Sequence, residues 1–378
     1  MEERLPSRKR PMRIDRRIAT HFDWSLFALA MILALVGILT IYSATRDSIQ
    51  EGSGILALRQ LYWLVIAVGA MVVSFMVDYH RMNHLAYHFY AGVLFLLFLI
   101  PLFGLVSGGS QRWLYLGYFS LQPSELGKLA IVLVLARNLQ FDEPTGGYCL
   151  KNLWLSFLLA TPIFSLILLQ PDLGTAIVIF IVFFSVVLIA GLHSGSFLRL
   201  AAVGIVLLPV GWQFLKAYQK KRIWTFLNPD LDPLGAGYHV IQSKIAIGSG
   251  RLLGKGYLEG TQNRLDFLPA QHTDFIFSVF AEEWGFVGCV ILLGLYLTLI
   301  LLSLRVVRRA RDRFGALLAF GMTAILFWQA TISVAMVTGI LPVAGIPLPF
   351  LSYGGSSLVV TMVAVGVLIN VSMRRFTF

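Results

Sequence analysis

Residues 267–277 read Phe-Leu-Pro-Ala-Gln-His-Thr-Asp-Phe-Ile-Phe, and within them a long polar loop passes into a strongly apolar run. The carboxylate of Asp274 lies at this boundary. A carboxylate in such a place can stay ionised and still border a partly desolvated cavity. We therefore expect Asp274 to take part in chemistry; the alternative is that Thr273 or Asp274 only caps the helix that follows.

The composition is that of a membrane protein. The 378 residues are 57% hydrophobic and 13% charged, whereas soluble domains carry about 25% charged residues. The net charge of +11 does not indicate nucleic acid as a partner, because most of the cations flank apolar runs instead of gathering on one face. Cys149 falls on the predicted inner side and Cys289 inside a predicted helix, so we expect no disulfide.

Ten apolar runs predict an all-α polytopic membrane protein. A helix needs about 20 mostly apolar residues to cross a hydrocarbon core about 30 Å thick. Such runs lie at 24–44, 60–77, 85–106, 121–139, 153–169, 173–191, 197–217, 275–303, 314–339 and 353–373. Between the seventh and eighth runs lies one large loop, 218–274, in which 238–247 predicts a short amphipathic helix.

The cations predict the orientation. Seven Lys or Arg residues lie in the segment 1–22, which we interpret as a basic cytoplasmic tail. With that tail inside, the inner segments hold 18 cations and the short outer loops hold 3, a strong positive-inside bias. Both termini are then cytoplasmic, the loop 218–274 is extracytoplasmic, and 23–378 forms a single membrane domain.

Two polar clusters lie near the predicted outer ends of helices. Glu125 and Lys128 are three residues apart, so they are neighbours on one helical face. They form either a salt bridge that makes two charges tolerable or part of a cavity in which Lys128 holds an anionic group such as a phosphate. Asp172, in Gln-Pro-Asp between the fifth and sixth runs, suits an N-cap, although a functional role stays open.

Further polar residues lie deeper in the apolar sequence. Glu282 and Glu283 follow Asp274 by about two helical turns, and at most one of them can share its face. The other must find a partner helix. His84 and His88 are too few for a zinc site, so we predict no metal-ligating residues. The Pro- and Gly-rich segment 339–357 cannot be regular helix, and we expect it to line the site.

Five motifs together resemble the SEDS family (shape, elongation, division and sporulation). In chain order they are Gly109-Ser-Gln-Arg-Trp113, Gln122-Pro-Ser-Glu-Leu126 with Lys128, Gln170-Pro-Asp-Leu-Gly174, Leu268-Pro-Ala-Gln-His-Thr-Asp-Phe275 and Pro347-Leu-Pro-Phe-Leu-Ser-Tyr-Gly-Gly355. The resemblance covers almost the whole chain. Residues 341–347 and 267–269 are more similar to the elongation members than to the division members.

This resemblance implies ten membrane helices and a peptidoglycan glycosyltransferase. Such an enzyme polymerises lipid II at the outer face of the bacterial cytoplasmic (inner) membrane for cell elongation and cell shape. It works with a class B penicillin-binding protein, the transpeptidase that crosslinks the new glycan, and we expect membrane lipids and other cell-elongation proteins as further partners. Ala270 departs from the family pattern, in which we expected a glutamate.

The resemblance also assigns residues. The family's functional aspartate corresponds to Asp274, its paired charges to Glu125 and Lys128, and its Arg-Trp to Arg112 and Trp113. We hypothesise that Asp274 is the general base for the acceptor hydroxyl. The expected substrate-binding residues are Arg112, Trp113, Glu125, Lys128, Asp172, Arg222, His272 and Ser356.

Cations would hold the leaving diphosphate. Lys128, Arg112 and Arg222 are the candidates, with a Mg²⁺ or Mn²⁺ ion at the diphosphate as an option and no other cofactor expected. A rival hypothesis is a transporter that flips lipid II, since buried charges and broken helices are also typical of transporters. A third is a membrane scaffold without chemistry of its own.

Overall fold

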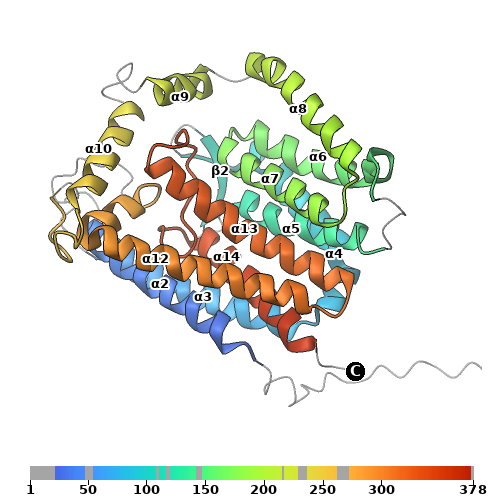
Figure 1. Cartoon of the computed structure of the whole chain (residues 1–378), viewed down its shortest axis with the longest axis horizontal. Helices are drawn as coiled ribbons and strands as arrows, with labels where there is room; N and C mark the ends of the chain where they lie inside the picture. Colours follow the sequence, from blue (N-terminus) through green and yellow to red (C-terminus); the bar gives the residue numbers. More distant parts are fainter. Residues whose placement is uncertain are drawn as a thin grey trace, which may run out of the picture.

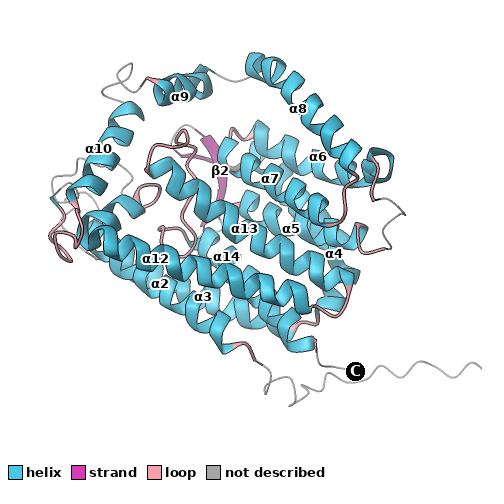
Figure 2. Cartoon of the chain, in the orientation of Figure 1, coloured by secondary structure: helices cyan, strands magenta, loops and turns pink. Residues whose placement is uncertain are grey.

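The computed structural model describes most of the chain as one body of packed helices (Figure 1). The described residues are 22–46, 54–107, 110–115, 120–141, 147–214, 217–228, 236–261 and 272–375. The predicted basic tail lies almost entirely outside them, as does the segment 262–271 of the predicted outer loop. Within the described residues, helix is the dominant structure (Figure 2).

A helix coincides with each of the ten predicted spans. The helices are α2 Trp24–Thr45, α3 Ile55–Met76, α4 Tyr79–Phe103, α5 Pro123–Asn138, α6 Trp154–Leu169, α7 Leu173–Ile189, α8 Ser194–Phe214, α12 Ile276–Arg309, α13 Arg313–Val337 and α14 Gly355–Arg374. Among the described residues, eight helical segments are long and apolar enough to cross a membrane, and α7 is a shorter apolar helix. The chain is thus a polytopic all-α membrane protein.

Several predicted boundaries were wrong. The helix α3 begins at Ile55 and not near 60, and α4 begins at Tyr79 and not near 85. The start of α4 follows from its N-cap, because the side chain of Asp78 accepts a hydrogen bond from the backbone N–H of His80 at 3.0 Å. His84 and His88 therefore lie inside α4.

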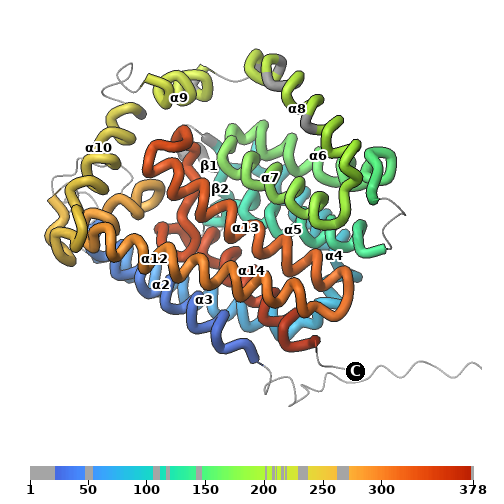
Figure 3. The backbone as a smooth tube through the Cα atoms, in the orientation of Figure 1, coloured from blue at the N-terminus to red at the C-terminus, as the bar shows by residue number. Residues whose placement is uncertain are grey.

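The sequence did not predict the small antiparallel sheet between α4 and α5. Its strands are β1 Leu105–Ser107, β2 Ser110–Tyr115 and β3 Ser120–Leu121, in the order β1-β2-β3. In the backbone trace, β2 lies close to the start of α7 (Figure 3). This sheet carries Arg112 and Trp113 on β2.

The large predicted outer loop contains two further helices. They are α9 Ala217–Leu227 and α10 Ala236–Ser249, the second of which confirms the short helix predicted at 238–247. Together with α8, they follow one another around the edge of the helical body (Figure 1). A short 3-10 helix, η1 Leu150–Leu153, precedes α6.

The centre of the body is formed by α5, α13 and α14, whose side chains are mostly buried. Helices α3 and α14 approach closely, since a Cβ atom at Gly366 would lie 2.0 Å from the hydroxyl oxygen of Ser74. Asn370 Nδ2 also donates to the carbonyl of Ser74 at 2.8 Å. Both cysteines are free, as predicted.

On the predicted cytoplasmic side, one arginine joins three helices. Arg313, the first residue of α13, donates from Nε to the carbonyl of Leu139 at 3.1 Å and from Nη2 to the carbonyl of Ala190 at 2.7 Å. These carbonyls lie at the carboxyl ends of α5 and α7, where backbone acceptors lack helical partners and a cation is favourable.

Candidate functional site

Asp274 lies just before α12 and does not cap it. The N-cap position is Phe275, whose side chain makes no capping hydrogen bond, so the interpretation of Thr273 or Asp274 as the N-cap was wrong. Burial raises the pKa of the Asp274 carboxyl above its ordinary value, while the charges of Arg222 and Arg112 offset part of this rise. Asp274 is thus a half-buried carboxylate under the influence of two arginine charges, and its role as the general base stays a prediction.

The Pro- and Gly-rich segment before α14 holds the backbone next to Asp274. Tyr353 N–H donates to the carbonyl of His272 at 2.9 Å, and Ser352 Oγ donates to the carbonyl of Thr273 at 2.7 Å. The rings of His272 and Tyr353 meet edge to face at 5.8 Å. A Cβ atom at Gly345 would lie 3.5 Å from Asp274 Oδ2. The segment therefore forms a wall against the carboxylate, as its composition predicted.

Arg112 connects the small sheet to the turn between α6 and α7. Its Nη2 donates to the carbonyl of Pro171 at 2.7 Å, and its Nη1 lies 3.5 Å from Asp172 Oδ1. Asp172 is also the N-cap of α7, where it accepts from Thr175 N–H at 3.3 Å. Ser124 donates to the same carboxylate at 3.2 Å. Asp172 thus has a structural role here, and its predicted contact with substrate stays a prediction.

Glu125 and Lys128 form a buried salt bridge. Lys128 Nζ lies 2.8 Å from Glu125 Oε2, and both side chains are 2% exposed. Lys128 also donates to Gln329 Oε1 at 2.8 Å, and Gln329 Nε2 in turn donates to the carbonyl of Pro347 at 3.1 Å. The pair therefore links α5 through α13 to the wall beside Asp274. A direct contact of Lys128 with a diphosphate stays a prediction.

Ser356 and Trp113 lie at the edge of this region. Ser356 Oγ donates to the carbonyl of Ser120 at 3.1 Å and accepts from the N–H of Gln122 at 3.2 Å. It thereby fixes β3 and the start of α5 to the first turn of α14. Trp113 is half-buried on β2. Neither residue is brought into contact with Asp274 by any interaction of the described residues, and their predicted roles stay predictions.

An apolar cavity lies beside the site. It has a volume of about 190 Å³ and is lined by α7, α9, α13 and the segment 341–346, with Arg222 and Gln219 as its polar lining residues. The α7 residues Leu173, Ile177 and Ile181 recur every four residues, so they form one stripe along the helix. We did not single out this stripe from the sequence, although its helical period was visible there.

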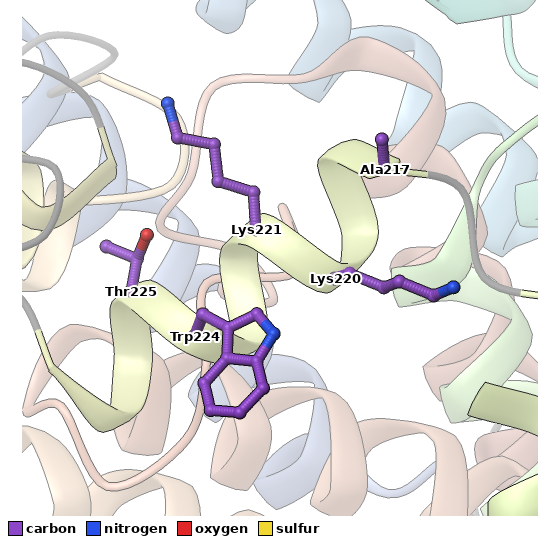
Figure 4. Close-up of a pocket in the computed structure, with 5 residues that line it drawn as sticks. All are labelled: Ala217, Lys220, Lys221, Trp224 and Thr225. Atoms are coloured by element: carbon purple, nitrogen blue, oxygen red, sulfur yellow. The ribbon is translucent and has the colours of Figure 1, made fainter. Parts of the chain in front are cut away.

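A more open pocket lies along α9, with a volume of about 480 Å³. Ala217, Lys220, Lys221, Trp224 and Thr225 line it. Lys220 and Lys221 point to different sides of the helix (Figure 4). Positive charge on α9 is therefore not confined to Arg222 at the apolar cavity.

The two deeper glutamates lie apart from Asp274. Glu283 accepts a hydrogen bond from Ser43 on α2, which confirms that one of the pair needs a partner helix. Glu282 binds Lys255 and Thr261 instead. Both acids are accounted for without contact to Asp274.

The described residues do not fit a protein-held cation. Within them, no group of three or more His, Cys, Asp or Glu side chains could hold a metal ion. Arg222 and Arg112 also bring positive charge to Asp274, which opposes cation binding by that carboxylate alone. We assign no step to a metal, and a Mg²⁺ or Mn²⁺ ion arriving with a diphosphate stays a prediction.

Comparisons with known proteins agree with this description. The family described as "Cell cycle protein", which comprises FtsW, RodA and SpoVE, matches residues 21–376. The "Peptidoglycan glycosyltransferase MrdB" of Escherichia coli (strain K12) is 41% identical over 360 residues, which cover 94% of each chain. The "Peptidoglycan glycosyltransferase RodA" of Treponema pallidum is 35% identical over 433 residues, covering 95% of this chain and 99% of that protein.

Solved structures give the same result. A chain described under "Structural coordination of polymerization and crosslinking by a peptidoglycan synthase complex" superposes with a TM-score of 0.81 at 31% identity, covering 94% of this chain and 99% of that one. The rod shape determining protein RodA of Thermus thermophilus superposes with a TM-score of 0.70 at 28% identity, covering 94% of this chain and 98% of that one.

Proposed function

Because the chain belongs to the FtsW, RodA and SpoVE family of cell cycle proteins, we propose that it is a peptidoglycan glycosyltransferase. It polymerises lipid II into glycan strands at the outer face of the bacterial cytoplasmic membrane, for cell elongation and cell shape. One observation carries the proposal. Asp274 lies against the wall of the Pro- and Gly-rich segment, where burial raises the pKa of its carboxyl and the charges of Arg222 and Arg112 lower it.

The chemistry needs a base at the acceptor and positive charge at the leaving group. The 4-hydroxyl oxygen of the acceptor sugar forms a bond to C1 of the donor sugar, while the bond from C1 to the diphosphate oxygen breaks. Asp274 takes the hydroxyl proton, and a pKa raised toward the working pH suits that role. The diphosphate leaves with the electron pair, and Arg222 and Arg112 stabilise its growing charge.

The apolar cavity suits the lipid part of the substrate. Its walls are the apolar stripe of α7, together with Ile332 and the segment 341–346, and Arg222 lies among them. A polyprenyl chain with a diphosphate head needs this combination, because the chain must leave water while the head must meet a cation. We place the diphosphate at Arg222 and the first part of the chain in the cavity.

A transpeptidase is the proposed partner. The solved structure with a TM-score of 0.81 is described as a peptidoglycan synthase complex that coordinates polymerization and crosslinking. We extend this to the present chain and propose a class B penicillin-binding protein as its crosslinking partner. Membrane lipids and other cell-elongation proteins complete the proposed set of partners.

Polymer formation from lipid II in detergent tests the proposal. Asp274→Asn and Asp274→Ala, purified in folded form with and without the class B partner, should form no glycan. Glu51→Gln, which changes a carboxylate of the predicted outer loop between the first two spans, is the matched control and should polymerise normally. Turnover by either Asp274 variant would remove the carboxylate from the mechanism.

The same assay addresses the rival hypotheses. A transporter that flips lipid II moves its substrate across a bilayer, and in detergent there is no bilayer to cross. Glycan formed by the purified chain in detergent therefore supports the enzyme, whereas flipping in vesicles without glycan in detergent would support the transporter. A scaffold predicts that changes at Asp274 have no effect in either assay.

A further inference from the structure

A loop of the outer region is inserted into a break in α12. We define the inserted loop as residues 250–261, which follow α10. The helix α12 is interrupted at Gly285, whose φ of 63° and ψ of −164° lie far from helical values. The break separates an outer piece of the helix, 276–284, from the rest.

Four backbone hydrogen bonds close the break from the loop. In a continuous helix, the carbonyls of Glu282 and Glu283 would accept from the N–H groups four residues later. Here they accept from Lys255 at 3.0 Å and Gly256 at 3.1 Å. The N–H groups of Phe286 and Val287 would donate to those two carbonyls in a continuous helix. Here Phe286 donates to the Arg251 carbonyl at 2.9 Å and Val287 to the Leu252 carbonyl at 3.0 Å. The loop thus replaces one turn of helical bonding.

The fit leaves no room for side chains at three glycines. A Cβ atom would lie 2.1 Å from the Ala281 carbonyl oxygen at Gly250, 2.0 Å from the Glu283 carbonyl oxygen at Gly254 and 2.2 Å from the Gly254 nitrogen at Gly285. Gly254 and Gly285 also have positive φ values, of 82° and 63°, which favour glycine. The close contact of loop and helix therefore depends on these glycines.

A buried ion pair fastens the loop to the outer piece of α12. Glu282 is fully buried, and its Oε1 lies 2.6 Å from Lys255 Nζ. The same oxygen accepts from the N–H of Thr261 at 2.9 Å and from its hydroxyl at 3.1 Å. A buried carboxylate is costly unless it is paired and hydrogen-bonded, so removal of Lys255 should weaken the insertion.

We propose that Lys255 and Glu282 are positioning residues for Asp274. The outer piece of α12 begins two residues after Asp274, and at the break the inserted loop bridges it to the inner part of α12. The outer piece is also attached to α2, where Ser43 donates to Glu283, and to α10 and α13, where Ser243 lies 2.8 Å from Ser278 and donates to the Val337 carbonyl at 2.6 Å. The inserted loop therefore contributes to the position of the carboxylate, together with these contacts and the wall.

Replacement of Lys255 tests this proposal, which rests on the proposed role of Asp274. In Lys255→Met, we expect faster amide exchange at Phe286 and Val287, a kcat for lipid II lower by roughly ten- to a hundredfold, and an unchanged KM. Lys255→Arg keeps the positive charge, so its amide exchange and its kcat should both stay close to those of the unchanged protein. Lys151→Met, which changes an exposed lysine on the opposite predicted side, is the control.

A second variant tests the backbone insertion without removing a charge. Gly254→Ala places a methyl group against the Glu283 carbonyl and should produce the same rise in exchange and fall in kcat. Three results for Lys255→Met and Gly254→Ala would each overturn the positioning role. They are faster amide exchange with full kcat, unchanged amide exchange, and a loss of kcat together with a loss of lipid II binding. Inactive Asp274→Asn beside fully active Lys255→Met overturns only this proposal, whereas active Asp274→Asn overturns the proposed function itself.

Discussion

Arg112 and Asp172 join the small sheet to the turn between α6 and α7. Nη1 of the arginine lies 3.5 Å from Oδ1 of the aspartate, and Nη2 donates to the neighbouring Pro171 carbonyl at 2.7 Å. Arg112 is also one of the two cations whose charge reaches Asp274. Asp172 therefore acts on Asp274 indirectly: it positions Arg112, whose charge lowers the pKa of the Asp274 carboxyl.

Asp172→Ala should destabilise the protein more than Asp172→Asn. Alanine removes the N-cap of α7, worth about 1 kcal/mol, and leaves the donors from Arg112 and Ser124 without their acceptor, worth about 1–3 kcal/mol more. Asparagine keeps an oxygen for Thr175 N–H but loses the charge. Thermal unfolding in detergent measures the difference. Equal melting temperatures for the two variants would show that the cap contributes nothing.

The buried pair of Glu125 and Lys128 can be tested by removing one charge or both. Lys128→Met leaves Glu125 buried without its ion partner, and we expect a loss of about 3–5 kcal/mol. Lys128→Met combined with Glu125→Gln removes both charges and should recover much of that stability. Unfolding measurements on the two variants check this expectation.

Polymerisation by the double variant separates two roles of Lys128. If the lysine only balances the buried charge of Glu125, a stable double variant should retain most of its activity. A double variant that is stable but inactive would instead indicate that Lys128 contacts the diphosphate, as the sequence suggested. The stability and the activity of the double variant are measured on the same purified protein.

An ordinary aspartate titrates near pH 4. We expect the rate of polymerisation to fall on the acid side at a higher pH than this. Burial raises the pKa of Asp274, and a general base is active only when ionised, so the rate should fall as pH falls through this raised pKa. Arg222→Gln removes a charge that lowers the pKa, so this fall in rate should move to higher pH. Arg222→Lys is the charge-preserving control. A fall in rate that stays at the same pH in Arg222→Gln would show that Arg222 does not act on Asp274.

Gly345→Ala should reduce activity more than a glycine change elsewhere. Gly345 has a φ of 70°, and its Cβ would lie 3.5 Å from Asp274 Oδ2. An alanine there costs about 1–2 kcal/mol of backbone strain and should move the wall beside the carboxylate. Gly294→Ala is the matched control, because Gly294 is helical and has open space around its Cβ position. Equal activity of the two variants would contradict the role of the wall.

The sequence predicted what depends on local composition. The apolar runs correspond to the ten helices, with starts shifted by five or six residues at α3 and α4. The prolines and glycines of 339–357 predicted a broken segment, and it does lie against Asp274. These features are visible in one stretch of chain because hydropathy and backbone restrictions act locally.

The remaining features depend on contacts between distant residues. Glu282 binds a lysine 27 positions away, and no local pattern selects Lys255 among the cations of the outer loop. The enclosure of Lys128 depends on Gln329 of another helix. The strands β1–β3 are so short that their pairing depends on the fold around them. The helix break at Gly285 was missed because a single glycine in an apolar run is compatible with a helix.

The bonds of Arg313 restrict how this protein can move. Arg313 fastens the carboxyl ends of α5 and α7 to the start of α13, and the hydrogen bond from Ser124 to Asp172 joins the opposite ends of α5 and α7. Because the two helices are tied to each other at both ends, they should move together as one rigid unit. We therefore expect a lipid to enter beside this pair and not between its two members.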